Sequence, residues 1–85
     1  MTGECRLCGH IGLVETHPVF MGSYRRLSDK YGATVTLCPY CHRYIHSGTG
    51  TDARRELQRT VQHEVMQTQG WTLDEWLNIF QKSWI

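Results

Sequence analysis

Two Cys-x-x-Cys pairs hold all the cysteines of the chain: Cys5, Cys8, Cys38 and Cys41. Two such pairs supply the four soft ligands of a closed structural Zn²⁺ site. A disulfide within one pair would close too small a loop to stabilise much, and no secretory signal peptide precedes the cysteines. We therefore expect structural zinc rather than redox or disulfide chemistry, and a reducing, cytoplasmic compartment.

Two histidines follow the second cysteine pair at a helical spacing. If Pro39 begins a helix, where its missing N–H costs nothing, His42 and His46 project from one face. His17 precedes them on a predicted strand, and a strand-end histidine and a helix histidine converge on a cleft in a ββα unit. Imidazoles there can hold a divalent metal that neutralises charge on a scissile phosphate. The alternative is that His42 and His46 are surface residues beside a zinc knuckle.

The elements that must position these side chains follow from the patterning of the first half. Residues 11–20 are rich in strand formers, so Glu15 and His17 should share one face, and Pro18 should end the ladder or mark an edge strand. Residues 21–32 have glycines near both ends and charges within, which predicts a long, functional loop. Residues 33–37 predict a second strand beside the first, followed by the short helix to His46.

The second half predicts two helices after a turn at residues 47–50. An amphipathic helix over about 52–69 should bury Leu57, Val61 and Val65 and end at Gly70. Residues 72–75 form a capping box that opens a last helix. Its apolar side chains should pack inward: Leu73, Trp76, Leu77 and Phe80. The sequence thus predicts one small zinc-stabilised α+β domain over residues 1–85, with a ββα core at 5–48 and a helical extension at 49–85.

Composition and charge narrow the function classes. The longest apolar runs are far too short to span a membrane, so we expect no membrane partner. The net charge is only +1, yet residues 24–59 carry seven basic and three acidic residues, against two and five elsewhere. A basic centre beside a metal site is compatible with a phosphate ligand, the alternative being an ordinary solvated surface.

Three stretches together resemble small phage-borne HNH endonucleases. They are Glu-Thr-His-Pro-Val-Phe at 15–20, the Gly-to-Gly segment at 22–32, and Leu-Cys-Pro-Tyr-Cys-His at 37–42. The family's counterparts look like Glu-x-His-His-hydrophobic-Phe, a Gly-x-x-Arg-x-x-Ser-Glu-Lys-Tyr-Gly loop, and Leu-Cys-Pro-x-Cys-His. The resemblance covers residues 5–48 and implies a ββα-metal fold, a structural zinc and a catalytic Mg²⁺, Mn²⁺, Ni²⁺ or Zn²⁺. It also implies metal-dependent cleavage of DNA, in the cytoplasm of a bacterial host cell.

Roles carry over by position under this resemblance. His17 and His42 match metal ligands, and His46 matches a further ligand or a phosphate contact. Arg25 and Arg26 match the arginine region of the loop, where a guanidinium can bind phosphate bidentately. Arg43, in the basic centre, completes the candidate nucleic-acid-binding residues.

Two positions depart from the family pattern. Pro18 replaces the family's second strand histidine, the general base that activates water, and proline has no group that can accept a proton. Ala33 replaces the middle asparagine, which ties down the loop. His17 would then have to serve as the base, with Glu15 as a ligand or orienting group, unless the metal alone activates water.

Two functions from different classes therefore remain open. The first is a metal-dependent HNH-type DNA endonuclease or nickase, which the three histidines favour. The second is a catalytically inactive HNH-fold zinc protein of phage origin that binds DNA, a host protein or a ribonucleoprotein complex, as anti-CRISPR inhibitors of host defence nucleases do. Pro18 and Ala33 favour this second function. A plain DNA-binding zinc module is a third interpretation, which the near-neutral charge does not recommend.

Overall fold

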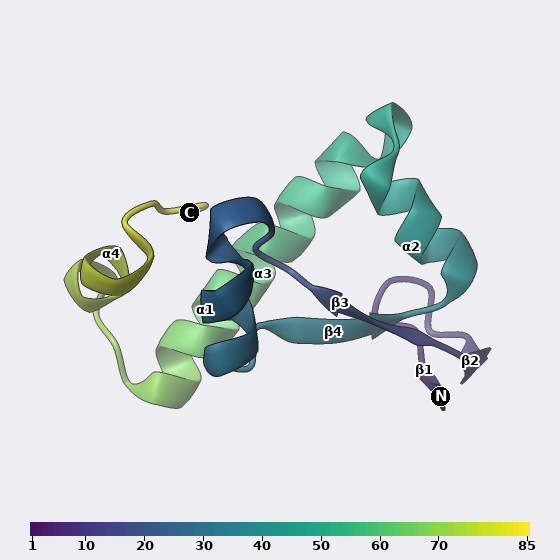
Figure 1. The fold of residues 1–85 in the computed structure, drawn as a ribbon, viewed down its shortest axis with the longest axis horizontal. Coiled ribbons are helices and arrows are strands. Elements are labelled where there is room, and N and C mark those ends of the chain that lie inside the picture. The colour runs from purple at the N-terminus through teal and green to yellow at the C-terminus, as the bar shows by residue number, and fades with distance from the viewer.

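Two paired strands, β3 (Glu15–Pro18) and β4 (Thr34–Leu37), lie at the centre of the first half of the chain, and helix α2 (Pro39–His46) packs against them. The computed structural model describes residues 1–85 and has two two-stranded antiparallel sheets and four α-helices (Figure 1). β1 (Thr2–Glu4) pairs with β2 (Ile11–Leu13), and β3 (Glu15–Pro18) pairs with β4 (Thr34–Leu37). In the second ladder His17 is opposite Val35 and Pro18 is opposite Thr34.

The strand predicted over residues 11–20 is divided between the two sheets. Ile11–Leu13 pairs with the N-terminal β1, which the sequence did not predict, and only Glu15–Pro18 pairs with β4. The buried Val14 lies between the two segments, and its N–H donates to the Met1 carbonyl at 3.0 Å. The ladder does end at Pro18, as expected for a residue that lacks an N–H.

The loop prediction for residues 21–32 is wrong, because most of this segment is helical. A 3₁₀ turn at Gly22–Tyr24 leads directly into α1 (Arg25–Lys30). Leu27 and Ser28 point inward from α1, and the Ser28 hydroxyl accepts from Phe20 N–H at 2.9 Å and donates to Phe20 O at 3.0 Å. Because Tyr24, Leu27 and Tyr31 share one face of the helix and pack on the core, tertiary burial overrides the loop-like composition.

Helix α2 (Pro39–His46) begins as the sequence predicts. Pro39 occupies the first helical turn, and Cys38 caps the helix because its sulfur accepts the Cys41 N–H at 3.4 Å. A 3₁₀ turn at Gly48–Gly50 then leads into α3 (Thr51–Gln69), the longest helix. α3 ends at Gly70, whose φ of +72° gives the left-handed C-cap.

Helix α4 (Leu73–Phe80) carries the predicted capping box, with Thr72 and Glu75 bonded reciprocally. Trp76 and Phe80 are buried and their rings stack at 3.8 Å, but Leu73 and Leu77 are 44% and 37% exposed. The inward packing predicted for those two leucines is therefore wrong, since this short helix buries only one narrow face. Trp84, in the C-terminal segment, packs on Phe20 at 4.5 Å between ring centroids and closes the core at this end.

The buried core runs from the cysteine pairs to the aromatic side chains of the second half. It includes the α3 stripe that the sequence predicts: Leu57, Val61 and Val65. The α+β class is as predicted, and so are helices α2, α3 and α4 in their order, whereas α1 was not predicted. None of the helices combines the length and the apolar character that crossing a membrane requires.

Candidate metal centres

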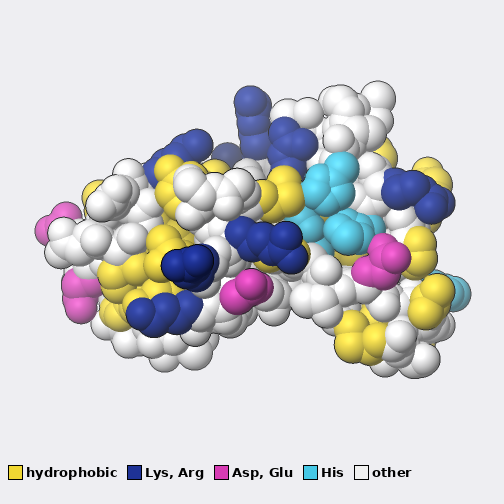
Figure 2. Space-filling model, viewed as in Figure 1, with side chains coloured by type: hydrophobic (Ala, Val, Ile, Leu, Met, Phe, Trp, Pro, Cys, Tyr) yellow, Lys and Arg dark blue, Asp and Glu magenta, His cyan; other side chains and the backbone are white.

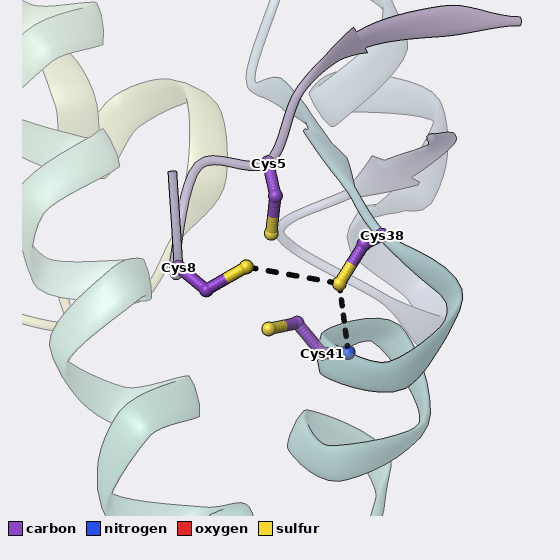
Figure 3. Close-up of side chains that lie close together, drawn as sticks. All are labelled: Cys5, Cys8, Cys38 and Cys41. Atoms are coloured by element: carbon purple, nitrogen blue, oxygen red, sulfur yellow. Dashed lines mark hydrogen bonds between the residues drawn. The ribbon is translucent and has the colours of Figure 1, made fainter. Parts of the chain in front are cut away.

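The four cysteines come together in one cluster. Cys5 and Cys8 lie in the turn between β1 and β2, whereas Cys38 and Cys41 lie at the start of α2 (Figure 3). Their sulfur atoms all lie within 4.8 Å of one another, and the Cys8 and Cys38 sulfurs are 3.9 Å apart. A tetrahedral zinc with Zn–S bonds of about 2.3 Å spaces its sulfurs about 3.8 Å apart. The cluster can hold a metal ion, and its donors and dimensions are compatible with zinc.

The ionisation of the cysteine thiols also favours a bound cation. Burial raises the pKa of the Cys5 thiol, but hydrogen bonds from the backbone N–H groups of Cys8, Cys38 and Leu7 outweigh it and lower the pKa to about 6. Burial, and then the neighbouring thiols, raise the pKa of Cys41. Adjacent thiols in a buried cluster cannot all ionise unless a positive ion neutralises them.

The N-terminal cysteine pair is attached to both of its neighbours. The Arg6 N–H donates to Thr36 O at 2.9 Å, and the Thr36 hydroxyl donates to Glu4 O at 2.8 Å. These two hydrogen bonds join the turn to β4. The Arg6 guanidinium forms an ion pair with Glu64 of α3. These bonds hold the turn against the start of α2, so the metal site is largely formed by the fold.

Three histidines form a second cluster, as the sequence reasoning anticipates. His17 comes from β3, and His42 and His46 come from successive turns of α2. Their ring centroids lie 5.1–5.3 Å apart, and one nitrogen from each ring lies within 4.8 Å of the others. Three imidazoles on one side of an ion leave coordination positions open, which is the pattern of catalytic rather than structural sites.

His17 has a buried nitrogen without a partner. Only 1% of the residue is exposed, and its Nε2 atom makes no hydrogen bond. Burial, and then the proximity of His42 and His46, lower the pKa of His17 to about 4, so the ring is neutral at pH 7. A buried nitrogen with a free lone pair costs stability unless something binds it. A metal ion shared with the other two rings would meet that need.

His42 is oriented by a carboxylate from the strand opposite. Its Nδ1 lies 2.8 Å from Glu15 Oε1, and Glu15 shares a face of β3 with His17, as predicted. Donation from Nδ1–H to the carboxylate leaves Nε2 as the free lone pair, an arrangement typical of metal-binding imidazoles. Of the two roles considered for Glu15, the geometry favours the orienting one.

The histidine cluster faces a hollow of about 320 Å³ that Arg25 and Pro18 also line. Figure 2 shows the histidine side chains together on this face, with Lys and Arg side chains around them. Arg26 lines a different hollow, beside Asp29, and the exposed Arg43 lines neither. Only one of the three predicted nucleic-acid-binding arginines therefore lies at the histidines. Pro18 leaves the hollow without a proton acceptor at its position.

Ser28 is a positioning residue that the sequence reasoning missed. Its hydroxyl bonds both backbone groups of Phe20, and its carbonyl accepts the Ala33 N–H at 2.8 Å. Ala33 itself is fully buried and has no polar side chain with which to hold the segment. Ser28 thus ties α1 to both strands beside the histidines. The inward stripe of Tyr24, Leu27 and Tyr31 was the signal that could have revealed it.

Comparison with known proteins identifies no relative. No family model matches the sequence, and no curated protein or solved structure is significantly similar to the chain. The resemblance to HNH endonucleases therefore rests on the sequence motifs alone.

Proposed function

We propose that the chain is a metal-dependent HNH-type DNA endonuclease or nickase with a structural zinc at its four cysteines. The observation that supports this most strongly is the convergence of His17, His42 and His46 on a hollow that Arg25 also lines. Two paired strands followed by a helix, as β3, β4 and α2 are along the chain, are also what a ββα-metal core would require, which supports the proposal. The buried, unpartnered Nε2 of His17 further supports a metal at this place.

Each side chain then has a defined task. His17 and His42 are the principal ligands, and His46 is a third ligand or a phosphate donor. Glu15 holds the His42 ring in the tautomer that presents Nε2, and Arg25 holds a phosphate oxygen at the edge of the hollow. A bound Mg²⁺, Mn²⁺, Ni²⁺ or Zn²⁺ would supply Lewis-acid polarisation of the phosphate and lower the pKa of a water molecule.

Pro18 is the reason that we expect DNA cleavage to be slow. It lines the hollow where the family has its general base, and loss of such a base costs about 10²–10⁴ in rate. His17 cannot easily compensate, because its nitrogen faces the other two imidazoles and is needed as a ligand. We therefore expect slow cleavage that depends on added metal.

The test is plasmid nicking with protein purified from defined medium. Zinc is counted per chain, and nicking is then assayed with added Mg²⁺, Mn²⁺ or Ni²⁺. We expect one zinc per chain, cleavage that needs added metal, and loss of cleavage in His42→Ala. Glu15→Gln should lower the activity about 10–100-fold. His63→Ala is the matched control, because His63 is exposed on α3 outside both clusters.

Two outcomes would contradict the proposal. One is zinc-loaded protein that cleaves with none of the metals. The other is nicking that persists undiminished in His42→Ala, which would point to a contaminating nuclease. Zinc content must be unchanged in every variant, so that lost activity is not lost folding.

The second candidate is an inactive HNH-fold zinc protein that acts by binding, and Pro18 is the observation that favours it. Such a protein, of phage origin, would block a host protein or ribonucleoprotein defence complex in the manner of anti-CRISPR inhibitors. Its activity should survive alanine at His17 and His42 but not loss of Cys38 or Cys41. The nuclease proposal predicts the reverse for His17, with folding intact and cleavage gone.

A further inference from the structure

A further hollow, which we call the basic hollow, lies between α3 and the C-terminal segment, and most of the side chains that line it are basic. It has a volume of about 380 Å³ and is lined by Arg54, Arg55, Gln58, Arg59, Lys82 and Trp84. Three arginines and one lysine are thus gathered without a carboxylate among the lining residues. Arg55 and Arg59 are one helical turn apart, where like charges destabilise a helix. An anionic ligand in the hollow would relieve that repulsion.

Hydrogen bonds hold the tail side of this hollow in place. The buried Gln62 of α3 donates to the Ser83 hydroxyl at 3.0 Å and accepts the Trp84 N–H at 2.7 Å. The indole N–H of Trp76 donates to the Lys82 carbonyl at 2.8 Å. Trp76 thus holds the Lys82 carbonyl, Gln62 holds the two residues that follow it, and the Lys82 ammonium lies 5.2 Å from the centre of the Trp84 ring. The cation is positioned beside the α3 arginines by the fold.

The basic hollow adjoins the histidine cluster through the end of α2. Arg54 Nη1 donates to the carbonyl of Ile45 at 3.0 Å, and Ile45 directly precedes His46. In Figure 2, Lys and Arg side chains lie along the upper edge of the same face that carries the histidines. A polyanion that reaches the histidines can therefore contact both hollows at once.

We propose that this hollow, above all Arg55, Arg59 and Lys82, binds the phosphate backbone of duplex DNA beside the group held at the histidines. This inference rests on the proposed function, which supplies the DNA substrate. The lining chemistry favours backbone over base contacts, because guanidinium and ammonium groups bind phosphates regardless of sequence. Trp84 is the one aromatic residue present, and its ring packs on Phe20, so no free platform for stacking a base remains. The Arg59–Glu56 ion pair at 2.8 Å is exposed and weak enough to exchange for a phosphate.

The experiment measures duplex binding separately from cleavage. Fluorescence anisotropy of a labelled duplex is recorded with zinc-loaded protein, without added divalent metal, over a salt series. Arg55→Gln and Lys82→Gln should each weaken binding several-fold, regardless of DNA sequence. Each should also reduce the slope of log K against log salt concentration by about 0.9. Lys30→Gln is the control, because it also removes one positive charge but from an exposed side chain that lines neither this hollow nor the one at the histidines. Zinc content and the thermal midpoint show that each variant is folded.

The outcomes separate this inference from the nuclease proposal. If the wild type nicks DNA while Arg55→Gln and Lys82→Gln behave as Lys30→Gln does, only the basic hollow is refuted. If duplex binding depends on these residues but no metal supports nicking, the hollow is supported and the nuclease is refuted. A wild type that neither binds nor nicks the duplex refutes both.

Discussion

His17 is the residue at which folding stability and metal binding meet. Its Nε2 is buried without a partner, and an unmet buried polar group typically costs about 1–3 kcal/mol. Protonation of this ring is disfavoured by its burial and by the proximity of the two other imidazoles. The site is therefore built to keep this ring neutral and available as a ligand.

The lowered pKa of His17 predicts a specific loss of stability in acid. The usual histidine pKa near 6.5 applies to the unfolded chain, against about 4 in the folded protein. Between these values the unfolded chain binds a proton that the folded protein does not, so stability falls as the pH falls from about 6.5 to about 4. Over the whole of this pH range, the free energy of unfolding should fall by about 3 kcal/mol.

Urea unfolding of zinc-loaded wild type and His17→Leu, without added second metal, checks this prediction at several pH values. Zinc loss from the cysteines in acid affects both proteins alike, so the difference between them isolates the imidazole. As the pH falls from about 6.5 to about 4, the free energy of unfolding of the wild type should decrease relative to that of His17→Leu. A difference that stays constant with pH would show that His17 does not titrate as predicted.

At the scale of elements, the turn between α2 and α3 has almost no space to spare. A Cβ atom placed on Gly50 would lie 1.9 Å from Tyr44 O and 2.9 Å from Ile45 Cα, both of which are backbone atoms. The φ of Gly50 is −93°, so crowding rather than backbone conformation requires the glycine. The two helices can meet here, and Arg54 can reach Ile45, only because residue 50 lacks a side chain.

Gly50→Ala should therefore destabilise the protein by about 3 kcal/mol, the upper end of usual overpacking costs, since backbone cannot move aside as a side chain does. Gly48→Ala is the matched control, because a Cβ there meets nothing within 4 Å. The free energy of unfolding in urea is the measurement. Equal stabilities for the two variants would mean that α2 and α3 separate at little cost.

The elements that sequence predicted well are those with local signals. Pro39 at the start of α2, Gly70 at the end of α3 and the capping box at Thr72 all act within one helical turn. The errors lie where distant segments decide. Residues 11–13 pair with an N-terminal strand, and α1 is helical because its inner face is buried on the core.

The same distinction applies to the sites. Both clusters were predictable, because the spacing of cysteines and histidines is visible in the sequence and a hairpin followed by a helix brings them together. Arg26 and Arg43 could not be excluded from the histidine hollow without coordinates. The basic hollow depends on Gln62 holding the tail against α3, a contact over more than twenty residues that no local pattern reveals.

At the scale of the whole molecule, the cysteine cluster and the hydrophobic core are one structure. Cys5, Cys38 and Cys41 belong to the same buried group of 14 residues as Phe20 and Trp76. A chain of 85 residues buries only part of its apolar surface on folding, so small domains of this kind often depend on a metal. Loss of the ion would leave four thiols, three of them buried, facing one another in the core.

If the cysteine cluster holds zinc, as proposed, its removal should unfold most of the chain rather than only its N-terminal turn. Structural zinc contributes about 10–16 kcal/mol in zinc-finger peptides, which matches or exceeds the total stability of about 5–15 kcal/mol usual for a domain. Circular dichroism after treatment with a strong chelator should show loss of the cooperative thermal transition, including the signal of α3. Stoichiometric Zn²⁺, but not Mg²⁺, should restore it, because thiolates prefer the softer ion.

Two variants test whether the loss of the cooperative transition is due to the cysteine site. Cys38→Ser removes a ligand and the N-cap of α2 together, so it should behave as chelated protein does even when zinc is present. His42→Ala should keep both its zinc and its cooperative transition, since the histidine cluster lies outside the core group. A chelated wild type that still melts cooperatively at an unchanged temperature would show that the aromatic half folds by itself. In that case the cluster would serve to position α2 and its histidines, and the core around Trp76 would account for the stability.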